Sequence, residues 1–318
     1  MYINKSIKLV LIGPAAALIV LLPFYGSGLA LHLAIIGMMG AIAALGLNIF
    51  YGYCGQINFG SAGFLAIGGY GVALLEKYAH IPYFASLIIA VVTSGIIAFV
   101  VSYPLLRLRE HILALGTLAF GLALYEAFAK GFTRYTGGED GIDISMLIVF
   151  GEPAGDRFFF YLFLICMVIC FWISYAMRNS RVGRAMVSIS QDEIAATSLG
   201  VNINKYLVIA FIISGMVTAL SGGLFVKWTG WCSPEYFSLM ISILILLAVV
   251  IGGAGSAVGA LTGGLFMFIL RELLAPLALY DVLAYGIVLT VFFLFIPQGI
   301  TGLVRTFLGK WFSIGIRG

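Results

Sequence analysis

The stretch YFASLIIAVVTSGIIAFVVSYPLL, residues 83–106, decides the fold class, because it runs for 24 residues without a charged side chain. A helix rises about 1.5 Å per residue, so a helix of this length can cross the roughly 30 Å hydrocarbon core of a bilayer. Similar runs recur along the whole chain, in which 62% of residues are hydrophobic and only 9% are charged. Soluble domains carry roughly 25% charged residues. The sequence therefore predicts an all-α, polytopic membrane protein.

About ten apolar segments have the length of transmembrane or partly re-entrant helices. They cover residues 7–25, 30–51, 62–79, 83–106, 111–131, 158–177, 207–226, 238–254, 257–275 and 282–304. The first is similar to a signal peptide, but it is long for one and no A-x-A cleavage site follows, so we expect it to be a span. Together the segments predict a single transmembrane domain over residues 1–318.

The distribution of basic residues predicts the orientation, because Lys and Arg are enriched in cytoplasmic loops. With the N-terminus inside and one crossing per span, eleven of the seventeen basic residues fall inside. The eleven are Lys5, Lys8, Arg107, Arg109, Arg178, Arg181, Arg184, Lys205, Arg305, Lys310 and Arg317. We therefore expect both termini in the cytoplasm and the protein in the cell inner (cytoplasmic) membrane. Two long loops result, an outer one at about 132–157 and an inner one at about 178–206.

The inner loop contains SISQDEIAATSLGV, residues 188–201, which has the pattern of a short polar helix. Ser190 and Glu193 have the spacing of a capping box, and Asp192 adds a second acid to the first turn. Gly200 is placed as the left-handed stop. About nine helical residues span only about 14 Å, too short to cross a bilayer. We expect a small helix on the cytoplasmic face.

Two roles are open for this helix. It either closes the loop at the membrane interface, next to Arg178, Arg181 and Arg184 that suit anionic headgroups, or it inserts into a groove of a cytoplasmic partner. Ala195 and Ala196 would give it a small face for close approach.

The same region resembles the permeases of branched-chain amino acid ABC importers. The segment GRAMVSISQDEIAATSLGV follows that family's pattern G-R-A-x-x-A-I-x-x-x-E-x-A-A-x-x-x-G-[IV], with Ser188 in place of the usual alanine. The resemblance covers nearly the whole chain through GLNIFYGYCGQINFGSAGFLAIGGYG at 46–71, TGGEDGI at 136–142, GGAGSAVGALTGG at 252–264 and FIPQGITGL. Gly69, Ala260 and Gly264 depart from it. The loop arrangement suits the M-type subunit better than the shorter H-type.

The resemblance implies a coupling helix that docks on an ATPase, formed by Arg184, Asp192, Glu193, Ile194, Ala195, Ala196, Leu199 and Gly200. It implies three kinds of partner besides the bilayer: a homologous H-type permease in a heterodimer, two ABC ATPase subunits that hold ATP and Mg, and an extracytoplasmic substrate-binding protein. It implies import of leucine, isoleucine or valine, with urea, short amides or another small organic solute as the alternative.

The chain carries no G-x-x-x-x-G-K-[ST] motif, and its glycine-rich runs contain no lysine, so we expect no ATP site, no catalytic residue and no cofactor in it. An ion-coupled secondary transporter is the alternative of another class, and a channel is a third. Secondary transporters usually keep ionisable residues deep in their spans, whereas these spans are nearly free of charge. Glu126, near the outer end of its span, has Lys130 at i+4 as a partner.

Two sets of residues are candidates for contact with substrate or binding protein. Asn48, Gln56, Asn58 and Ser61 gather in a glycine-rich break, where irregular backbone either lines a transport path or forms a tight turn between spans. Thr136, Gly137, Gly138, Glu139 and Asp140 form an acidic outer surface, either for docking or simply solvated. The four cysteines, Cys54, Cys166, Cys170 and Cys232, form no CxxC pair, and we expect free thiols and no metal. We see no patch for nucleic acid.

Overall fold

The computed structural model describes residues 23, 28–108, 110–149, 151–275, 286 and 290. The long helices are α2 (Gly28–Leu47), α3 (Ser61–Ala79), α4 (Tyr83–Leu105), α5 (Glu110–Glu126), α7 (Asp156–Asn179), α8 (Arg181–Gln191), α10 (Ile203–Thr229), α11 (Leu239–Gly252) and α12 (Ala257–Leu274). The short elements are η1 (Asn48–Gly52), η2 (Ala127–Gly131), α6 (Thr133–Thr136), η3 (Gly138–Asp140), α9 (Glu193–Ser198), η4 (Pro234–Phe237) and the strands β1 (Ile142–Asp143), β2 (Ile148–Val149), β3 (Glu152–Pro153) and β4 (Trp231–Cys232).

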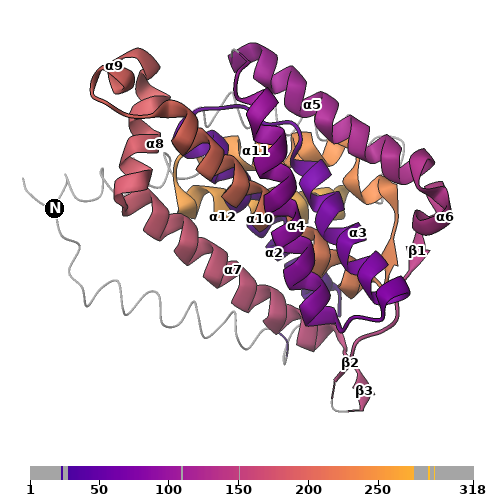
Figure 1. Ribbon diagram of the computed structural model, residues 1–318. Helices are drawn as coiled ribbons and strands as arrows, with labels where there is room; N and C mark the ends of the chain where they lie inside the picture. The colour runs from indigo at the N-terminus through magenta and orange to yellow at the C-terminus, as the bar shows by residue number, and fades with distance from the viewer. Residues whose placement is uncertain are drawn as a thin grey trace, which may run out of the picture.

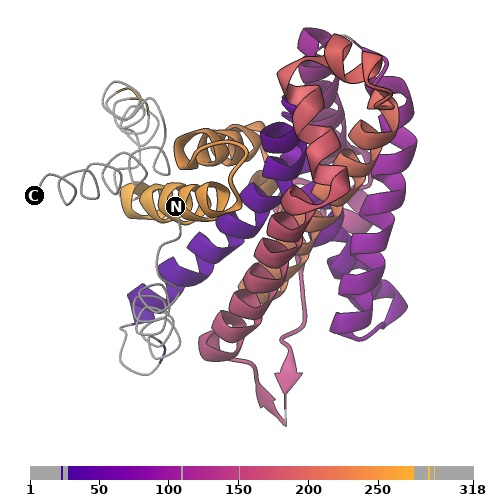
Figure 2. The same ribbon diagram turned by 90° about the vertical axis from the view of Figure 1, so that its left-hand side faces the viewer.

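The long helices, α8 apart, run back and forth between two ends of the molecule (Figure 1). One end, here called the α9 end, holds α8 and α9 together with the turns after α2, α4 and α11. The opposite end, called the strand end, holds the four short strands, and pink strand arrows mark it at the bottom of a second view (Figure 2). The alternation places the loops 132–157 and 178–206 at opposite ends, as the sequence predicts.

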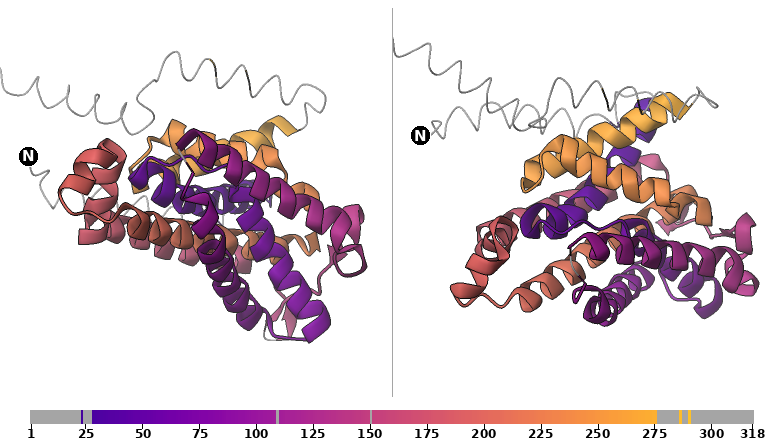
Figure 3. Two further views of the ribbon diagram at one scale, coloured as in Figure 1. Left: turned by 45° about the horizontal axis from the view of Figure 1, so that its top comes forward. Right: turned by 90° about the horizontal axis from the view of Figure 1, so that it is seen from above.

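Helices α2 and α10 form the centre of the bundle. Helix α2 packs on α12, α10 and α7, and α10 packs on α3 and α4 as well. Figure 3 shows α11 and α12 on one side of this pair and α4 and α5 on the other. In an apolar stretch of 18 consecutive residues within the α2 span, 83% of the residues are buried, against 33% in the corresponding stretch of α4. The inner helix is therefore surrounded by protein, whereas most of the α4 surface is not covered by the described part of this chain.

Small residues allow α3 and α10 to approach closely. A methyl group at Gly68 would collide with the backbone carbonyl of Ala219, and one at Gly222 with the carbonyl of Leu65. Such contacts bring two backbones together in a membrane, where apolar side chains gain little from leaving lipid. The glycine content of the chain is used here for helix packing.

Gly222→Ala is expected to lower the thermal unfolding midpoint of the purified protein in detergent. Overpacking of this kind costs about 1–3 kcal/mol, because α3 and α10 must separate to accept the methyl group. Gly28→Ala is the matched control, since nothing lies within 4 Å of the added atom. An equal midpoint for the two variants would show that the contact between α3 and α10 is not tight.

Seven described helical segments are long and apolar enough to cross a membrane. They are 28–52, 83–105, 112–131, 156–179, 203–229, 234–252 and 257–274. Helix α3 runs between the same two ends but carries Glu76 and Lys77. Eight of the ten predicted spans thus coincide with helices, and the multi-pass all-α fold is confirmed. The predicted spans 7–25 and 282–304 lie almost wholly outside the described residues, so the count of ten stays a prediction.

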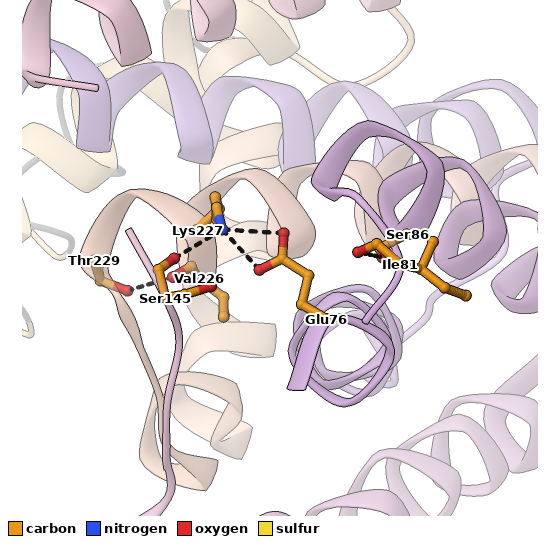
Figure 4. A network of polar contacts seen from close by, with 7 residues as sticks. All are labelled: Glu76, Ile81, Ser86, Ser145, Val226, Lys227 and Thr229. Carbon is orange, nitrogen blue, oxygen red and sulfur yellow. Dashed lines mark hydrogen bonds and ion pairs between the residues drawn. The ribbon is translucent and has the colours of Figure 1, made fainter. Parts of the chain in front are cut away.

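A buried ion pair, which the sequence did not predict, connects the elements of the strand end. Lys227 of α10 donates to both carboxylate oxygens of Glu76, at 3.0 and 2.7 Å, and to the carbonyl of Ser145 at 2.8 Å (Figure 4). The two side chains are only 2% and 8% exposed. All three ammonium hydrogens therefore have acceptors. The pair joins α3, α10 and the long loop, which β1 also holds by pairing with β4.

Candidate functional site

The segment between α7 and α10 begins with α8, an amphipathic helix. Ser180 caps it by accepting a hydrogen bond from the amide of Gly183 at 3.1 Å. Gly183, Met186 and Ile189 are buried at spacings of three residues, so one face of α8 packs against the bundle. Arg184 lies exposed and donates to the carbonyl of Asn179 at 3.1 Å. This helix anchors the rest of the segment.

The structure corrects the predicted start of the small helix. Ser190 does not cap it, because α8 continues through Gln191 and the Ser190 hydroxyl donates back to the carbonyl of Val187. The chain is extended at Asp192, whose Oδ1 accepts from the amides of Ile194 and Ala195 at 2.8 and 3.0 Å. Asp is as good an N-cap as Ser, and here it ends α8 and starts α9 at one residue. The predicted single helix is therefore two.

Helix α9 turns only part of the expected face outward, since Ala195 is exposed but Ala196 is not. Ala196 is 1% exposed and packs into the protein, so it cannot be the contact surface for a partner. Ile194 and Leu199 are instead 81% and 82% exposed. Two large apolar side chains are thus exposed on one short segment outside the membrane-length helices, and exposed apolar surface marks candidate docking sites. Gly200, at φ +83°, is confirmed as the left-handed stop of α9.

A hydrogen bond connects α9 to the glycine-rich turn between α2 and α3. The Nε2 of Gln56 donates to Oε1 of Glu193 at 2.9 Å. Gly55, at φ +77°, lies against Ser190, where a methyl group would come within 3.2 Å of its Cβ. Gln56 and Glu193 line a cavity of about 620 Å³ at the α9 end, together with Leu106 and Leu207. A displacement of α9 would therefore be passed to the turn.

A second hydrogen bond joins the two glycine-rich turns of the α9 end. Oδ1 of Asn48, a fully buried residue in η1, accepts from the amide of Gly255 at 2.9 Å. Gly255 belongs to the turn between α11 and α12, 207 residues further along the chain. The connection between α2 and α3 is thus hydrogen-bonded at Gln56 to the α9 segment and, separately, at Asn48 to the α11–α12 turn.

The other predicted path residues have local roles. Oδ1 of Asn58 accepts from the amide of Gly60 at 2.7 Å and shapes the turn before α3. Ser61 is 1% exposed, and its hydroxyl has no hydrogen-bond partner among the described residues. Of the four candidates, only Gln56 lines the large cavity at this end. A role of the set in a transport path stays a prediction.

The predicted outer docking residues divide into two groups. Thr136 is buried, and its hydroxyl donates to the carbonyls of Phe128 and Phe132. Gly137 and Gly138 have positive φ and form the turn, with Gly138 buried. Glu139 and Asp140 are exposed at the strand end. Gly137 is exposed as well, so three of the five residues can meet a partner, and their role as a docking surface stays a prediction.

The four cysteines are free thiols, as predicted. Glu126 and Lys130 form the predicted i,i+4 ion pair at 3.0 Å.

The arrangement of polar groups at the α9 end is suited to transmitting motion, since it links an exposed helix to turns between spans.

Comparison with known proteins identifies a permease family. The model of the family described as "Branched-chain amino acid transport system / permease component" matches residues 29–297 of this chain. The chain is 30% identical to the high-affinity branched-chain amino acid transport system permease protein LivM of Salmonella typhimurium, over 89% of this chain and 72% of LivM. It is 25% identical to LivH of Escherichia coli and 27% identical to BraD of Pseudomonas aeruginosa, each over 84% of this chain and 92% of the relative.

No solved structure matches the chain. The family match covers the eight described helices that run between the two ends, and the relatives are permease proteins by name. With its buried central helix, its apolar spans and its exposed α9, this multi-pass membrane protein belongs to the family of branched-chain amino acid transport permease components.

Proposed function

We propose that this chain is the membrane-spanning subunit of an ATP-driven importer for leucine, isoleucine and valine. In the assembled importer it pairs with a homologous H-type permease, receives substrate from an extracytoplasmic binding protein, and binds two separate ATPase subunits that hold ATP and Mg. The observation that carries the proposal is α9, which exposes Ile194 and Leu199 while Glu193 holds it to the α2–α3 turn.

The α9 end faces the cytoplasm in this proposal. In the predicted topology, eleven of the seventeen basic residues of the whole sequence fall on this side, which supports the orientation because such residues are enriched on the cytoplasmic side. The described ones are Arg107, Arg178, Arg181, Arg184 and Lys205. The strand end, with the acidic Glu139 and Asp140, then faces outward in the cell inner membrane.

Coupling follows from the hydrogen bonds at the α9 end. When the ATPase subunits close on ATP, they move α9, and the Gln56–Glu193 bond passes the movement to the α2–α3 turn. The bond between Asn48 and the amide of Gly255 extends it to the α11–α12 turn. ATP can shift the balance between inward-open and outward-open states only if its subunits contact α9 differently in the two.

Uptake by reconstituted vesicles tests this function. The complete importer, with ATP on the side of α9 and binding protein on the other, should accumulate leucine, and omission of ATP or of the binding protein should stop uptake. The chain alone should accumulate nothing under an imposed proton or sodium gradient. Uptake by the chain alone would favour an ion-coupled transporter, and accumulation of urea or acetamide without leucine would overturn the substrate assignment.

A further inference from the structure

A second cavity lies at the strand end, away from α9. It has a volume of about 480 Å³ and is bounded by α2, α7, α10, α12 and the segment leading into α11. Its walls include Ile36 and Met39 of α2, Phe225 of α10 and Phe268 of α12. Pockets that bind small molecules have volumes of roughly 300–1,000 Å³ and are mostly apolar. This cavity therefore fits an aliphatic group.

Charged side chains of both signs border the same cavity. Asp156, the first residue of α7, accepts a hydrogen bond on Oδ1 from Nε1 of Trp228 at 3.0 Å. Glu272 of α12 lies 3.2 Å from Nε2 of His32. Arg271 also lines the cavity, is exposed, and makes no hydrogen bond or ion pair with any of the described residues. A cation and a carboxylate, both with hydrogen-bonding capacity that no described residue uses, thus lie at an apolar pocket.

We infer that this cavity binds a zwitterionic amino acid with an aliphatic side chain, an inference that rests on the proposed function. The planar guanidinium of Arg271 matches the two oxygens of the α-carboxylate. Oδ2 of Asp156 accepts a hydrogen bond from the α-ammonium, while Trp228 holds the carboxylate in place through Oδ1. The aliphatic side chain lies between Ile36 and Phe268. The site is the first that substrate meets at the outer end.

This site predicts a selectivity for ligands with both an α-carboxylate and an α-ammonium group, which an apolar pocket without charged residues would not show. Leucine methyl ester lacks the carboxylate charge, and 4-methylpentanoate lacks the ammonium group. Each should therefore bind less well than leucine by about tenfold, the effect of losing one charge-assisted contact. Urea, which has no aliphatic part, should not compete.

Binding of radiolabelled leucine to the full-length chain in lipid nanodiscs tests the site, with the three compounds as competitors. Arg271→Gln should weaken leucine binding about tenfold and leave the affinity for the methyl ester unchanged, so that the preference between them disappears. Asp156→Asn should likewise remove the preference for leucine over 4-methylpentanoate. Arg134→Gln, which removes an exposed charge at the same end, is the matched control and should bind as the unmodified protein does.

Two results would overturn the site, namely absence of leucine binding to the unmodified chain, or unchanged affinity and unchanged preference in Arg271→Gln. Uptake by the complete importer separates this failure from a failure of the proposed function. Leucine uptake that is ATP-driven and insensitive to Arg271→Gln removes the site and keeps the function. Absence of leucine uptake by the unmodified importer removes the function itself.

Discussion

Lys227→Met is expected to lower the free energy of unfolding by about 3–5 kcal/mol, the cost of leaving one member of a buried ion pair without its partner. Methionine has nearly the shape of lysine, so the change removes the charge and keeps the volume. Glu76, 8% exposed, then keeps a carboxylate that water cannot reach, and Ser145 loses its donor. Unfolding of the purified protein by a denaturing detergent measures the loss.

Two further variants show whether the loss comes from the unpaired charge. Glu76→Met combined with Lys227→Met should recover most of the stability, because an apolar pair of similar volume replaces the ions. Lys130→Met breaks the pair with Glu126, whose side chains are 66% and 54% exposed, and should change little. If the double variant is no more stable than Lys227→Met alone, the buried charge is not the cause.

The second large effect concerns the exposed face of α9. Ile194→Asn together with Leu199→Asn should lower ATP-driven leucine uptake at least tenfold, although the protein folds normally. Burial of one such side chain against a partner contributes about 1.5–3 kcal/mol, and both are more than 80% exposed in the isolated chain. Without them the ATPase subunits bind weakly. Uptake and co-purification of the ATPase subunits measure the two consequences.

Ser198→Asn is the control for this experiment. Ser198 is exposed on the same helix, so the variant shows that α9 accepts asparagine while both apolar side chains stay in place. Normal uptake by the control and lost uptake by the double variant would support docking. Normal uptake and co-purification by the double variant would eliminate α9 as the ATPase contact.

The spans could be predicted from the sequence because lipid demands apolar residues over a fixed length. The stretch 83–106 forms α4 at Tyr83–Leu105, and 257–275 forms α12 at Ala257–Leu274. The predicted span 207–226 was too short, since α10 extends to Thr229 and includes Lys227. A lysine normally marks a span end, but Glu76 of another helix neutralises this one. A hydropathy pattern cannot predict an ion pair between residues that are distant in sequence, such as Lys227 and Glu76.

The α8–α9 segment could also be predicted only in part, because its local sequence does not decide where every helix begins and ends. Its position and its stop at Gly200 followed from local rules of helix termination. Ser190 and Asp192 are both good caps, however, and the sequence alone does not choose between them; in the structure α8, with Met186 and Ile189 buried, continues past Ser190 and ends at Asp192. The link from Gln56 to Glu193 could not be predicted, because it depends on how turns 137 residues apart meet.

The central position of α2 has a consequence for how this chain can vary. A lipid-facing surface accepts almost any apolar side chain, so the residues of α4 can be exchanged for other apolar residues without disturbing helix packing. Neighbouring helices accept only one shape, and at Gly40 even a methyl group would collide with the ring of Phe268. A helix screened from the bilayer can instead carry a polar residue such as Asn48. Across related permeases, the innermost helix should therefore diverge most slowly, and the outermost ones fastest.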